Sequence, residues 1–304
     1  MTPRRTRRTV SKLSARDVLE KIGLEIYNKE IEKTIPYNSE LVGILRKARF
    51  ADRLYKESNR GLRSAPSHFS QLDYRFYTNN TIYSGDDRHP CFGRNQDRFS
   101  EDQESECGNK INDYKSENVG TSCAPPRRRH MCDQNLEFLN NDNTETTHDL
   151  LGNVLVTAKY EGESIVENHP NTKTSDVCTA LARSFADIGD IVRGRDMFKP
   201  NTVDKVHEGL KVVFQKIYDD LKKKGINDYN DISGNYYKLR EAWWTANRDQ
   251  VWKAMTCVAP ENAYFRKTEA DGIGISSLIL PYSKCGRDTD PPVVDYIPQR
   301  LRWM

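Results

Sequence analysis

The chain has 304 residues, enough for one large domain or two ordinary ones, and its formal net charge is +3. Hydrophobic residues make up 36% and charged residues 30%, so the core must be small for this length and crosslinks are expected to support it. No apolar run reaches the roughly 18 residues of a membrane-spanning helix, which excludes a membrane span. The chain lacks the motifs of phosphate loops, dinucleotide-binding turns, serine hydrolases and zinc proteases, which argues against an enzyme.

Positive charge is concentrated at the start of the chain. Residues 1–63 contain 16 Lys and Arg against 8 Asp and Glu, a net charge of +8, so the remainder carries −5. A basic arm on an acidic body predicts a polyanionic partner for the arm. The opening stretch MTPRRTRRTVSKL lacks the apolar core of a standard secretory signal peptide.

Two helices are predicted in this basic region. Ser14 and Asp17 form a typical helix start, apolar residues then recur at near-helical spacing, and Pro36 ends the helix. A second amphipathic helix is expected from Ser39 to Tyr55. Residues 1–60 are therefore expected to form a helical hairpin.

The second of these helices is expected to carry a cationic stripe on its polar side and exit. The basic residues of this stretch are Arg46, Lys47, Arg49, Arg53, Lys56 and Arg60. Several cations on one face suit a linear polyanion such as heparan sulfate, with Arg4, Arg5, Arg7 and Arg8 as a mobile auxiliary arm. Nucleic acid would be attracted by the same charge, and an ordinary solvated face is the other alternative. The concentration of charge favours a functional surface.

Seven widely spaced cysteines predict a disulfide framework. They are Cys91, Cys107, Cys123, Cys132, Cys178, Cys257 and Cys285. No CxxC motif occurs, which weakens the redox and zinc-ribbon interpretations, and the odd count leaves one thiol without an internal partner. Residues 57–130 are rich in polar and turn-forming residues and are expected to be loops held by crosslinks.

The stretch CAPPRRRHMC (123–132) is the densest cluster of reactive side chains. Cys123, His130 and Cys132 could ligate zinc with Cys107, but the spacing and the stiff Pro125-Pro126 pair favour a basic loop closed by disulfides. Arg127, Arg128 and Arg129 could bind sulfate or carboxylate groups. Alternatively, one or two of them pair with buried acids in the core, and the sequence does not decide between these roles.

Helical periodicity returns after Asp133. Helices are expected at 133–140, 147–160, 175–192, 202–224 and 236–257. In the last of these, Tyr236, Tyr237, Trp243, Trp244 and Trp252 could form a ligand-stacking platform, but aromatic residues at helical spacing are more often core.

The helix at 175–192 raises the question of a reactive site. Val177, Leu181, Phe185, Ile188 and Val192 form one apolar stripe, expected to pack against the helix that carries Trp252. Asp187 and Asp190 share a face and could bind a cation or act as an acid–base pair. A solvated acidic edge paired with Arg183 or Arg193 is the favoured interpretation.

Four stretches resemble the signature blocks of a known family. They are ARSFADIGDIVRGRDMF (182–198), WWTANRDQVWKAMTC (243–257), CAPPRRRHMC (123–132) and DYIPQRLRW (295–303). They resemble the alpha-type Duffy-binding-like domain of the variant erythrocyte membrane protein family of Plasmodium falciparum, and residues 1–60 look like the N-terminal segment that precedes it. The resemblance implies export to the surface of the infected erythrocyte, by a route that needs no standard signal peptide.

The resemblance implies a mainly α-helical fold in parts. These are a basic N-terminal segment (1–60), a disulfide-rich first subdomain (61–132), a helix-bundle second subdomain (133–260), and a linker with the start of an incomplete third subdomain (261–304). It also implies the disulfides Cys91–Cys132, Cys107–Cys123 and Cys178–Cys257, with Cys285 unpaired in this chain. Cys178 would then be a crosslink rather than a nucleophile.

The implied function is adhesion to host cells. The expected partners are host glycosaminoglycans, erythrocyte surface receptors, antibodies and an adjacent cysteine-rich domain, with no nucleic acid, metal or cofactor. Alpha-type domains of the family can mediate rosetting, and family ligands include heparan sulfate and blood-group sugars. The candidate glycan-binding residues are Arg46, Lys47, Arg49, Arg53, Lys56 and Arg127 to Arg129. The alternative is a structural, antigenically variable head domain whose cysteine-rich neighbour binds the receptor.

Overall fold

The structure is a computed structural model of the chain. It describes residues 15–51, 62–95, 97–100, 102–107, 123–140, 142–171, 175–199, 205–260, 263, 285 and 289–303. Five helices of 19 or more residues form its framework: α1 (Ala15–Thr34), α4 (Thr147–Asn168), α5 (Ser175–Arg193), α6 (Lys205–Lys223) and α7 (Tyr237–Met255). The mainly helical fold expected from the sequence is confirmed.

Shorter elements connect these helices. The short α-helices are α2 (Asn38–Leu41), α3 (Pro126–Arg129) and α8 (Gln299–Trp303). The 3-10 turns are η1 (Ile35–Tyr37), η2 (Leu45–Lys47), η4 (Phe69–Gln71), η5 (Gly85–Arg88), η6 (Gln134–Phe138) and η8 (Val293–Tyr296). Two antiparallel two-stranded ladders pair β1 (Arg49–Ala51) with β2 (Leu62–Ser64), and β3 (Glu106–Cys107) with β4 (Cys123–Ala124). No helix among the described residues is long and apolar enough to cross a membrane.

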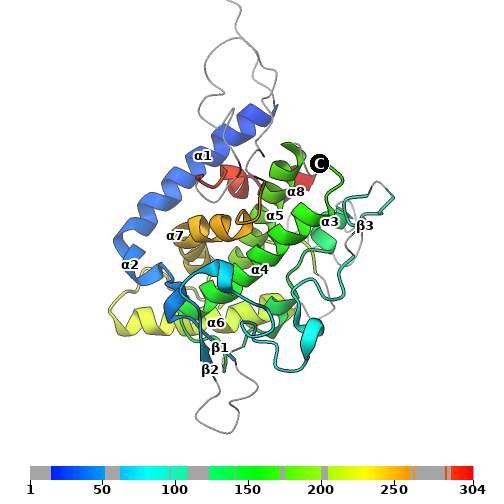
Figure 1. Cartoon of the computed structure of the whole chain (residues 1–304). Helices are drawn as coiled ribbons and strands as arrows, with labels where there is room; N and C mark the ends of the chain where they lie inside the picture. The colour runs from blue at the N-terminus through cyan, green and yellow to red at the C-terminus, as the bar shows by residue number, and fades with distance from the viewer. Residues whose placement is uncertain are drawn as a thin grey trace, which may run out of the picture.

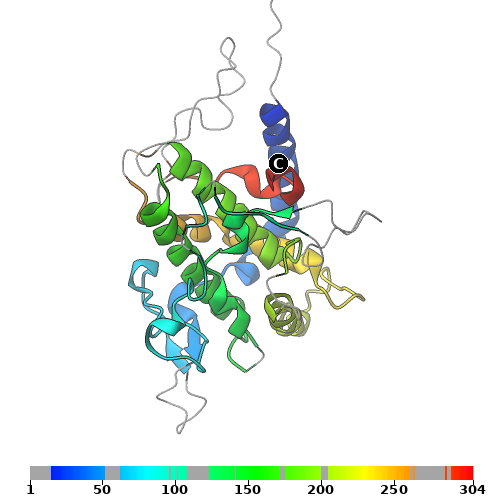
Figure 2. The ribbon, with the colours of Figure 1, turned by 90° about the vertical axis from the view of Figure 1, so that its right-hand side faces the viewer.

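Helix α7 is the centre of the packing. Helices α4 and α5 pack on it and on each other, and α1 lies against it together with the C-terminal segment 289–303 (Figures 1 and 2). Two glycines allow these close approaches. A Cβ atom on Gly162 of α4 would lie 1.9 Å from the carbonyl oxygen of Met255, and one on Gly189 of α5 would lie 2.8 Å from the ring of Trp244. At Gly162 the backbones of α4 and α7 therefore meet directly, and at Gly189 the Trp244 ring packs against the α5 backbone.

The core between α5 and α7 has the expected composition. Val177, Leu181, Phe185, Ile188 and Val192 are all buried, as are Trp243, Trp244 and Trp252. The ring of Phe185 lies 5.1 Å from that of Trp244 and 5.3 Å from that of Trp252. The prediction of an inward apolar stripe is confirmed. That of aromatic core residues is confirmed for Tyr236 and the three tryptophans, but it is wrong for Tyr237, which is 38% exposed.

The acidic residues of α5 are also buried, and here the prediction of a solvated edge is wrong. Asp187 is 0% exposed and Asp190 is 4% exposed. Asp190 pairs with Arg193, which was one of the two expected partners. It also pairs with Arg302 from α8. Because α8 covers this side of α5, the helix is enclosed on its polar face as well as its apolar one.

The second N-terminal helix does not form as predicted. After α2 the chain becomes extended at Val42, and residues 49–51 form β1, so residues 15–51 do not form a helical hairpin; the end of the expected helix, 52–55, lies outside the described residues. Backbone N–H groups that would bond within a helix donate instead to side chains of α4 and α7. That of Gly43 donates to Asn247 Oδ1 (2.7 Å), and that of Arg49 donates to Asp149 Oδ1 (2.8 Å). These tertiary hydrogen bonds outweigh the local helical pattern.

Helix α4 has a well-defined start. Thr146 is its N-cap: its hydroxyl accepts the Asp149 N–H, and the Asp149 carboxylate accepts the Thr146 N–H, which completes a capping box. Because Asp149 also accepts the Arg49 N–H, the start of α4 positions β1. The β1–β2 ladder therefore sits at the N-terminal end of α4.

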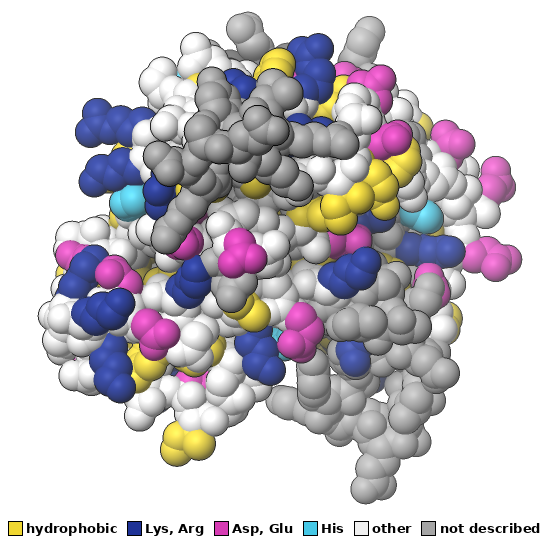
Figure 3. All heavy atoms as spheres, turned by 90° about the horizontal axis from the view of Figure 1, so that it is seen from below, with side chains coloured by type: hydrophobic (Ala, Val, Ile, Leu, Met, Phe, Trp, Pro, Cys, Tyr) yellow, Lys and Arg dark blue, Asp and Glu magenta, His cyan; other side chains and the backbone are white. Residues whose placement is uncertain are grey.

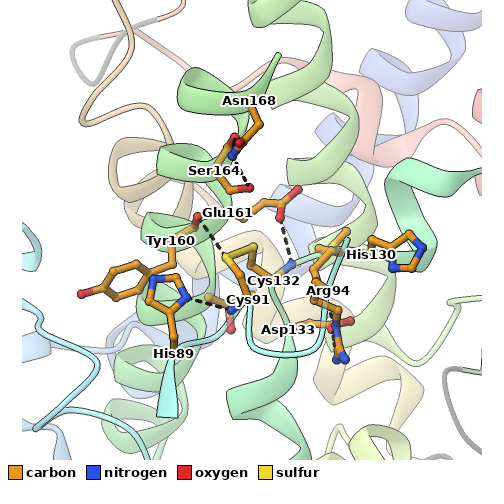
Figure 4. Close-up of a disulfide and its surroundings, with 12 residues drawn as sticks. His89, Cys91, Arg94, His130, Cys132, Asp133, Tyr160, Glu161, Ser164 and Asn168 are labelled. Carbon is orange, nitrogen blue, oxygen red and sulfur yellow. Dashed lines mark hydrogen bonds and ion pairs between the residues drawn. A yellow bond between two sulfur atoms is a disulfide. The ribbon is translucent and has the colours of Figure 1, made fainter. Parts of the chain in front are cut away.

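Three disulfides occur among the described residues. Cys91–Cys132 and Cys107–Cys123 are the pairs that the family resemblance implies. The first lies against α4, where Glu161 accepts the Cys132 N–H at 2.9 Å (Figure 4). The third disulfide joins Cys178 to Cys285, so the expected Cys178–Cys257 pair and the expected unpaired Cys285 are wrong.

Cys285 is held next to Cys178 in the buried core. The Cys285 N–H donates to the Ala263 carbonyl, and this places Cys285 in the buried core next to the start of α5. Cys257 is half-buried just after α7 and is not in any of the three disulfides. Cys178 is a structural crosslink, as expected, although its partner differs.

Candidate functional site

Three of the candidate glycan-binding residues lie together on one exposed edge. Arg46 and Lys47 belong to η2 and Arg49 to β1, and all three are exposed. Their orientation follows from their neighbours Leu45 and Phe50, which are buried against the core. These anchors direct the basic side chains outward, although the local structure is a turn and a strand rather than a helix.

Arg46 and Lys47 are not consumed by acidic partners. Within the described part of the chain, neither side chain has an ion pair or a hydrogen bond. Arg49 has only a distant one, with its Nη2 atom 3.7 Å from Glu145 Oε2. Exposed ion pairs of this kind are weak, so the positive charge of Arg49 remains available to a ligand.

Lys216 of α6 and Lys224, the residue that follows α6, extend this basic edge. Lys216 lies 3.4 Å from Glu145, the acid that also faces Arg49, and Lys224 lies 2.7 Å from Glu40. We call the group Arg46, Lys47, Arg49, Lys216 and Lys224 the cationic edge; Lys216 is half-buried and the other four are exposed. Figure 3, a view from below Figure 1, shows Lys and Arg side chains interspersed with Asp and Glu on the face that carries α6 and the β1–β2 ladder.

The positive charge of the cationic edge affects His148, which lies next to it. Burial lowers its pKa, and the positive charges of Lys47 and Lys224 lower it further, against the opposing effect of Asp149. Its Nδ1 atom accepts the Ile44 N–H at 3.1 Å. A neutral imidazole therefore links the edge to α4 at neutral pH.

The α6 lysines were missed at the sequence level. They lie about 170 residues after Lys47 in the chain, and nothing in their local pattern connects them with it. The sequence did indicate that α6 has an exposed polar face, opposite the face that buries Val213, Phe214 and Ile217. Arg53, Lys56 and the expected auxiliary arm (Arg4, Arg5, Arg7 and Arg8) lie outside the described residues.

The arginines of the CAPPRRRHMC stretch mostly have structural roles. Arg127 Nη1 donates to Asp187 Oδ2 at 2.5 Å, and Arg128 donates to Asp133 Oδ2 (3.0 Å) and Asp196 Oδ2 (2.5 Å). Both arginines are at least nine-tenths buried. They correspond to the alternative in which one or two of these side chains pair with buried acids, and Arg128 has no surface to offer a glycan.

Arg129 differs from its neighbours. Its side chain is 41% exposed and lies 3.0 Å from Glu106 of β3. The zinc alternative for this loop fails on its ligands, because Cys123 and Cys132 belong to separate disulfides and neither supplies a thiolate. His130 Nδ1 accepts the Asn95 N–H at 3.3 Å.

The buried acids of α5 have opposite protonation behaviour. Burial raises the pKa of Asp187, but the charges of Arg127, Arg302 and Arg128 outweigh it and hold that pKa at about 2. For Asp190 burial is the dominant effect, and it raises the pKa to about 6 despite Arg302 and Arg193. The network holds α8 and α3 against α5, and this is a structural rather than a catalytic use of the carboxylate pair.

Comparisons with known proteins agree with this architecture. The model of the Duffy binding domain matches residues 121–302, and the model of the N-terminal segments of PfEMP1 matches residues 14–49. The chain is similar to the N-terminal NTS-DBL1-alpha and CIDR-gamma double domain of the PfEMP1 protein from the Plasmodium falciparum varO strain. The identity is 51%, the TM-score is 0.82, and the match covers 96% of this chain and 43% of that one.

More distant similarities include receptor-binding proteins. A PfEMP1 DBLb domain solved bound to human ICAM-1 shares 27% identity and a TM-score of 0.71, over 99% of this chain and 62% of that one. The Duffy receptor beta form of Plasmodium knowlesi is 25% identical over 140 residues, which are 43% of this chain and 11% of the receptor. The chain thus spans about a tenth of the length of this curated relative.

Proposed function

Because the chain belongs to the Duffy binding domain family, we propose that it is a host-cell adhesion domain. It combines an N-terminal segment with a DBL-alpha domain of PfEMP1. The proposal includes exposure on the surface of the infected erythrocyte and contact with red-cell or endothelial receptors. It is supported by the ICAM-1 complex of the similar DBLb domain, because that relative uses the same helical fold to bind a host protein.

We further propose that the cationic edge binds sulfated glycans such as heparan sulfate or heparin, in the context of rosetting. The observation that carries this proposal is the pair Arg46 and Lys47, exposed side by side with no acidic partner among the described residues. Sulfate groups are closely spaced anions, so neighbouring cations can meet successive groups along one glycan chain. Arg53 and Lys56 remain candidate members of this site.

The test is heparin affinity chromatography of the double variant Arg46→Ser/Lys47→Ser. Each exposed contact contributes about 0.2–1 kcal/mol, so losing two should weaken heparin binding about two- to thirtyfold and lower the salt concentration of elution. The matched control is Lys238→Ser/Lys253→Ser, which removes the same charge from two exposed positions of α7.

The two double variants separate a local site from a general charge effect. The proposal requires that the control keep nearly the retention of the unchanged chain. Equal losses in both variants would mean that heparin follows net charge only, and unchanged retention of the Arg46/Lys47 variant would remove the edge from the binding site. Circular dichroism of both variants checks that they are folded.

A second function is favoured by the domain arrangement of the varO relative. In that structure the corresponding region is followed by a CIDR-gamma domain, within a chain of which this one covers 43%. The chain would then act as a structural, antigenically variable head domain, recognised by antibodies, while a cysteine-rich neighbour binds the receptor. Elution from heparin at physiological salt, together with no binding to red cells, would support this function over the first.

A further inference from the structure

A polar cleft lies at the end of α4 that is remote from the cationic edge. It has a volume of about 1100 Å³, large enough for a small organic ligand. It is bounded by residues 97–100, 102 and 103, the C-terminal end of α4 with residues 168–171, and the first turns of α5. Arg49 contacts Asp149 at the start of α4 and Asn168 is its last residue, so about 29 Å of helix separates the two places.

The floor of the cleft contains a guanidinium group with an available edge. Arg127 lines the cleft and is 8% exposed, and its Nη1 atom is occupied by Asp187. Its Nε and Nη2 atoms donate to no acceptor among the described residues. These two parallel N–H donors form the edge that binds a carboxylate in a bidentate manner. Asp187 fixes the orientation of the group in advance.

The walls of the cleft suit a ring that carries hydroxyl groups. Phe99 and His169 line the cleft with their ring centroids 5.1 Å apart, and the Arg98 guanidinium lies over the Phe99 ring at 4.9 Å. The apolar surface that these rings leave in the cleft can contact the C–H groups of a sugar. Burial lowers the pKa of His169, so this ring is neutral at pH 7. The remaining polar lining provides amide and hydroxyl partners: Ser100, Gln103, Asn168, Asn171 and Thr179.

Acidic residues of the cleft restrict the charge of the ligand. Asp97, Asp102 and Asp176 line it together with Arg127 and Arg183. Three carboxylates repel a polysulfated chain, but they accept hydrogen bonds from hydroxyl groups. The ligand that fits carries several hydroxyl groups and no more than one carboxylate, placed on Arg127, and so differs from the polyanion that the cationic edge would select.

We propose that this cleft binds a hexuronate, a six-carbon sugar acid, with its carboxylate on the Nε–Nη2 edge of Arg127 and its ring against Phe99 and His169. The hydroxyl groups bond to the amides and carboxylates of the lining. The site is independent of the cationic edge, so failure of heparin binding there leaves this inference intact, and the reverse also holds.

The test is titration of the isotopically labelled chain with D-glucuronate, D-glucose and acetate, followed by amide NMR shifts. D-glucuronate should cause saturable shifts at residues 97–103, 168–171 and 176–183, and D-glucose and acetate should each bind at least about tenfold more weakly. Arg127→Lys keeps the charge but loses the two-pronged edge, and it should weaken glucuronate binding about tenfold.

Arg129→Lys is the matched control, because Arg129 lies two residues away and does not line the cleft. It should leave glucuronate binding unchanged. If Arg127→Lys fails to fold, Phe99→Leu tests the ring contact instead and should also weaken binding. Absence of saturable shifts, equal binding of acetate and glucuronate, or equal affinities of the Arg127 and Arg129 variants would each overturn the proposal.

Discussion

Replacing Asp295 with alanine should strongly destabilise the domain, because this buried carboxylate of η8 neutralises a buried arginine of α7. Its oxygens accept hydrogen bonds from Arg248 Nε (2.9 Å) and Nη2 (2.8 Å), and from Trp244 Nε1 (2.8 Å). Asp295 is 1% exposed and Arg248 is 2% exposed. Without the carboxylate, the guanidinium would be left charged in the core.

The expected loss is about 3–5 kcal/mol of the free energy of unfolding, the usual cost of removing one partner of a buried ion pair. Tyr27 and Tyr296 reduce this loss. Their ring centroids lie 4.8 and 5.6 Å from the Arg248 guanidinium carbon, and their π faces still attract its positive charge when Asp295 is absent. For a slope of about 3 kcal/mol per M urea, the unfolding midpoint should fall by about 1–2 M. Equilibrium urea unfolding, followed by tryptophan fluorescence, measures this shift.

The matched control is Asp249→Ala, which removes the other carboxylate near Arg248. Asp249 lies 4.0 Å from Arg248 Nη1, but its side chain is 64% exposed, so the expected loss is below about 0.5 kcal/mol. A loss below about 1 kcal/mol for Asp295→Ala, or equal losses for the two variants, would refute the reasoning from burial.

Three further predictions follow from the described contacts. Peptide mapping without reduction should recover Cys178 linked to Cys285, and Cys285→Ser should lower the free energy of unfolding by about 2–5 kcal/mol; a Cys178 peptide joined elsewhere would contradict this. The pKa of Asp190 is raised to about 6, so the fold loses stability as this carboxyl ionises between pH 4 and 7. Urea unfolding should therefore show that Asp190→Asn gains stability relative to the unchanged chain over that range. A difference that stays constant with pH would contradict the raised pKa. Gly162→Ala should lower the free energy of unfolding by about 1–3 kcal/mol, because its Cβ would meet the Met255 carbonyl. An unchanged free energy of unfolding would show that α4 and α7 separate easily.

The α-helical framework was largely predictable, because long amphipathic patterns identify helices well. The apolar stripe of α5 needed only local periodicity. The burial of Asp187 could not be predicted from local periodicity, because its partners Arg127 and Arg302 lie 60 and 115 residues away in the chain. Only the packing of α3 and α8 against α5 brings these charges together, and a helical pattern contains no information on such contacts.

The candidate site was predictable in part. The exposure of Arg46, Lys47 and Arg49 followed from charge concentration, but their helical setting did not form because side chains of α4 and α7 capture the backbone of this stretch. The partner of Cys178 also depends on tertiary structure. Cys257 and Cys285 were equally available by count, and the family resemblance indicated the wrong one.

The contact between α1 and the C-terminal segment has a consequence for biosynthesis. Gly23 of α1 lies against Val293, and the ring of Tyr27 lies 5.4 Å from that of Tyr296. The ribosome makes the second surface about 270 residues after the first, which takes about 14–54 s at ordinary elongation rates. During this interval the nascent α1 lacks part of the surface that it covers in the native state. The native packing of α1 therefore forms only after α7 and residues 289–303 have been synthesised.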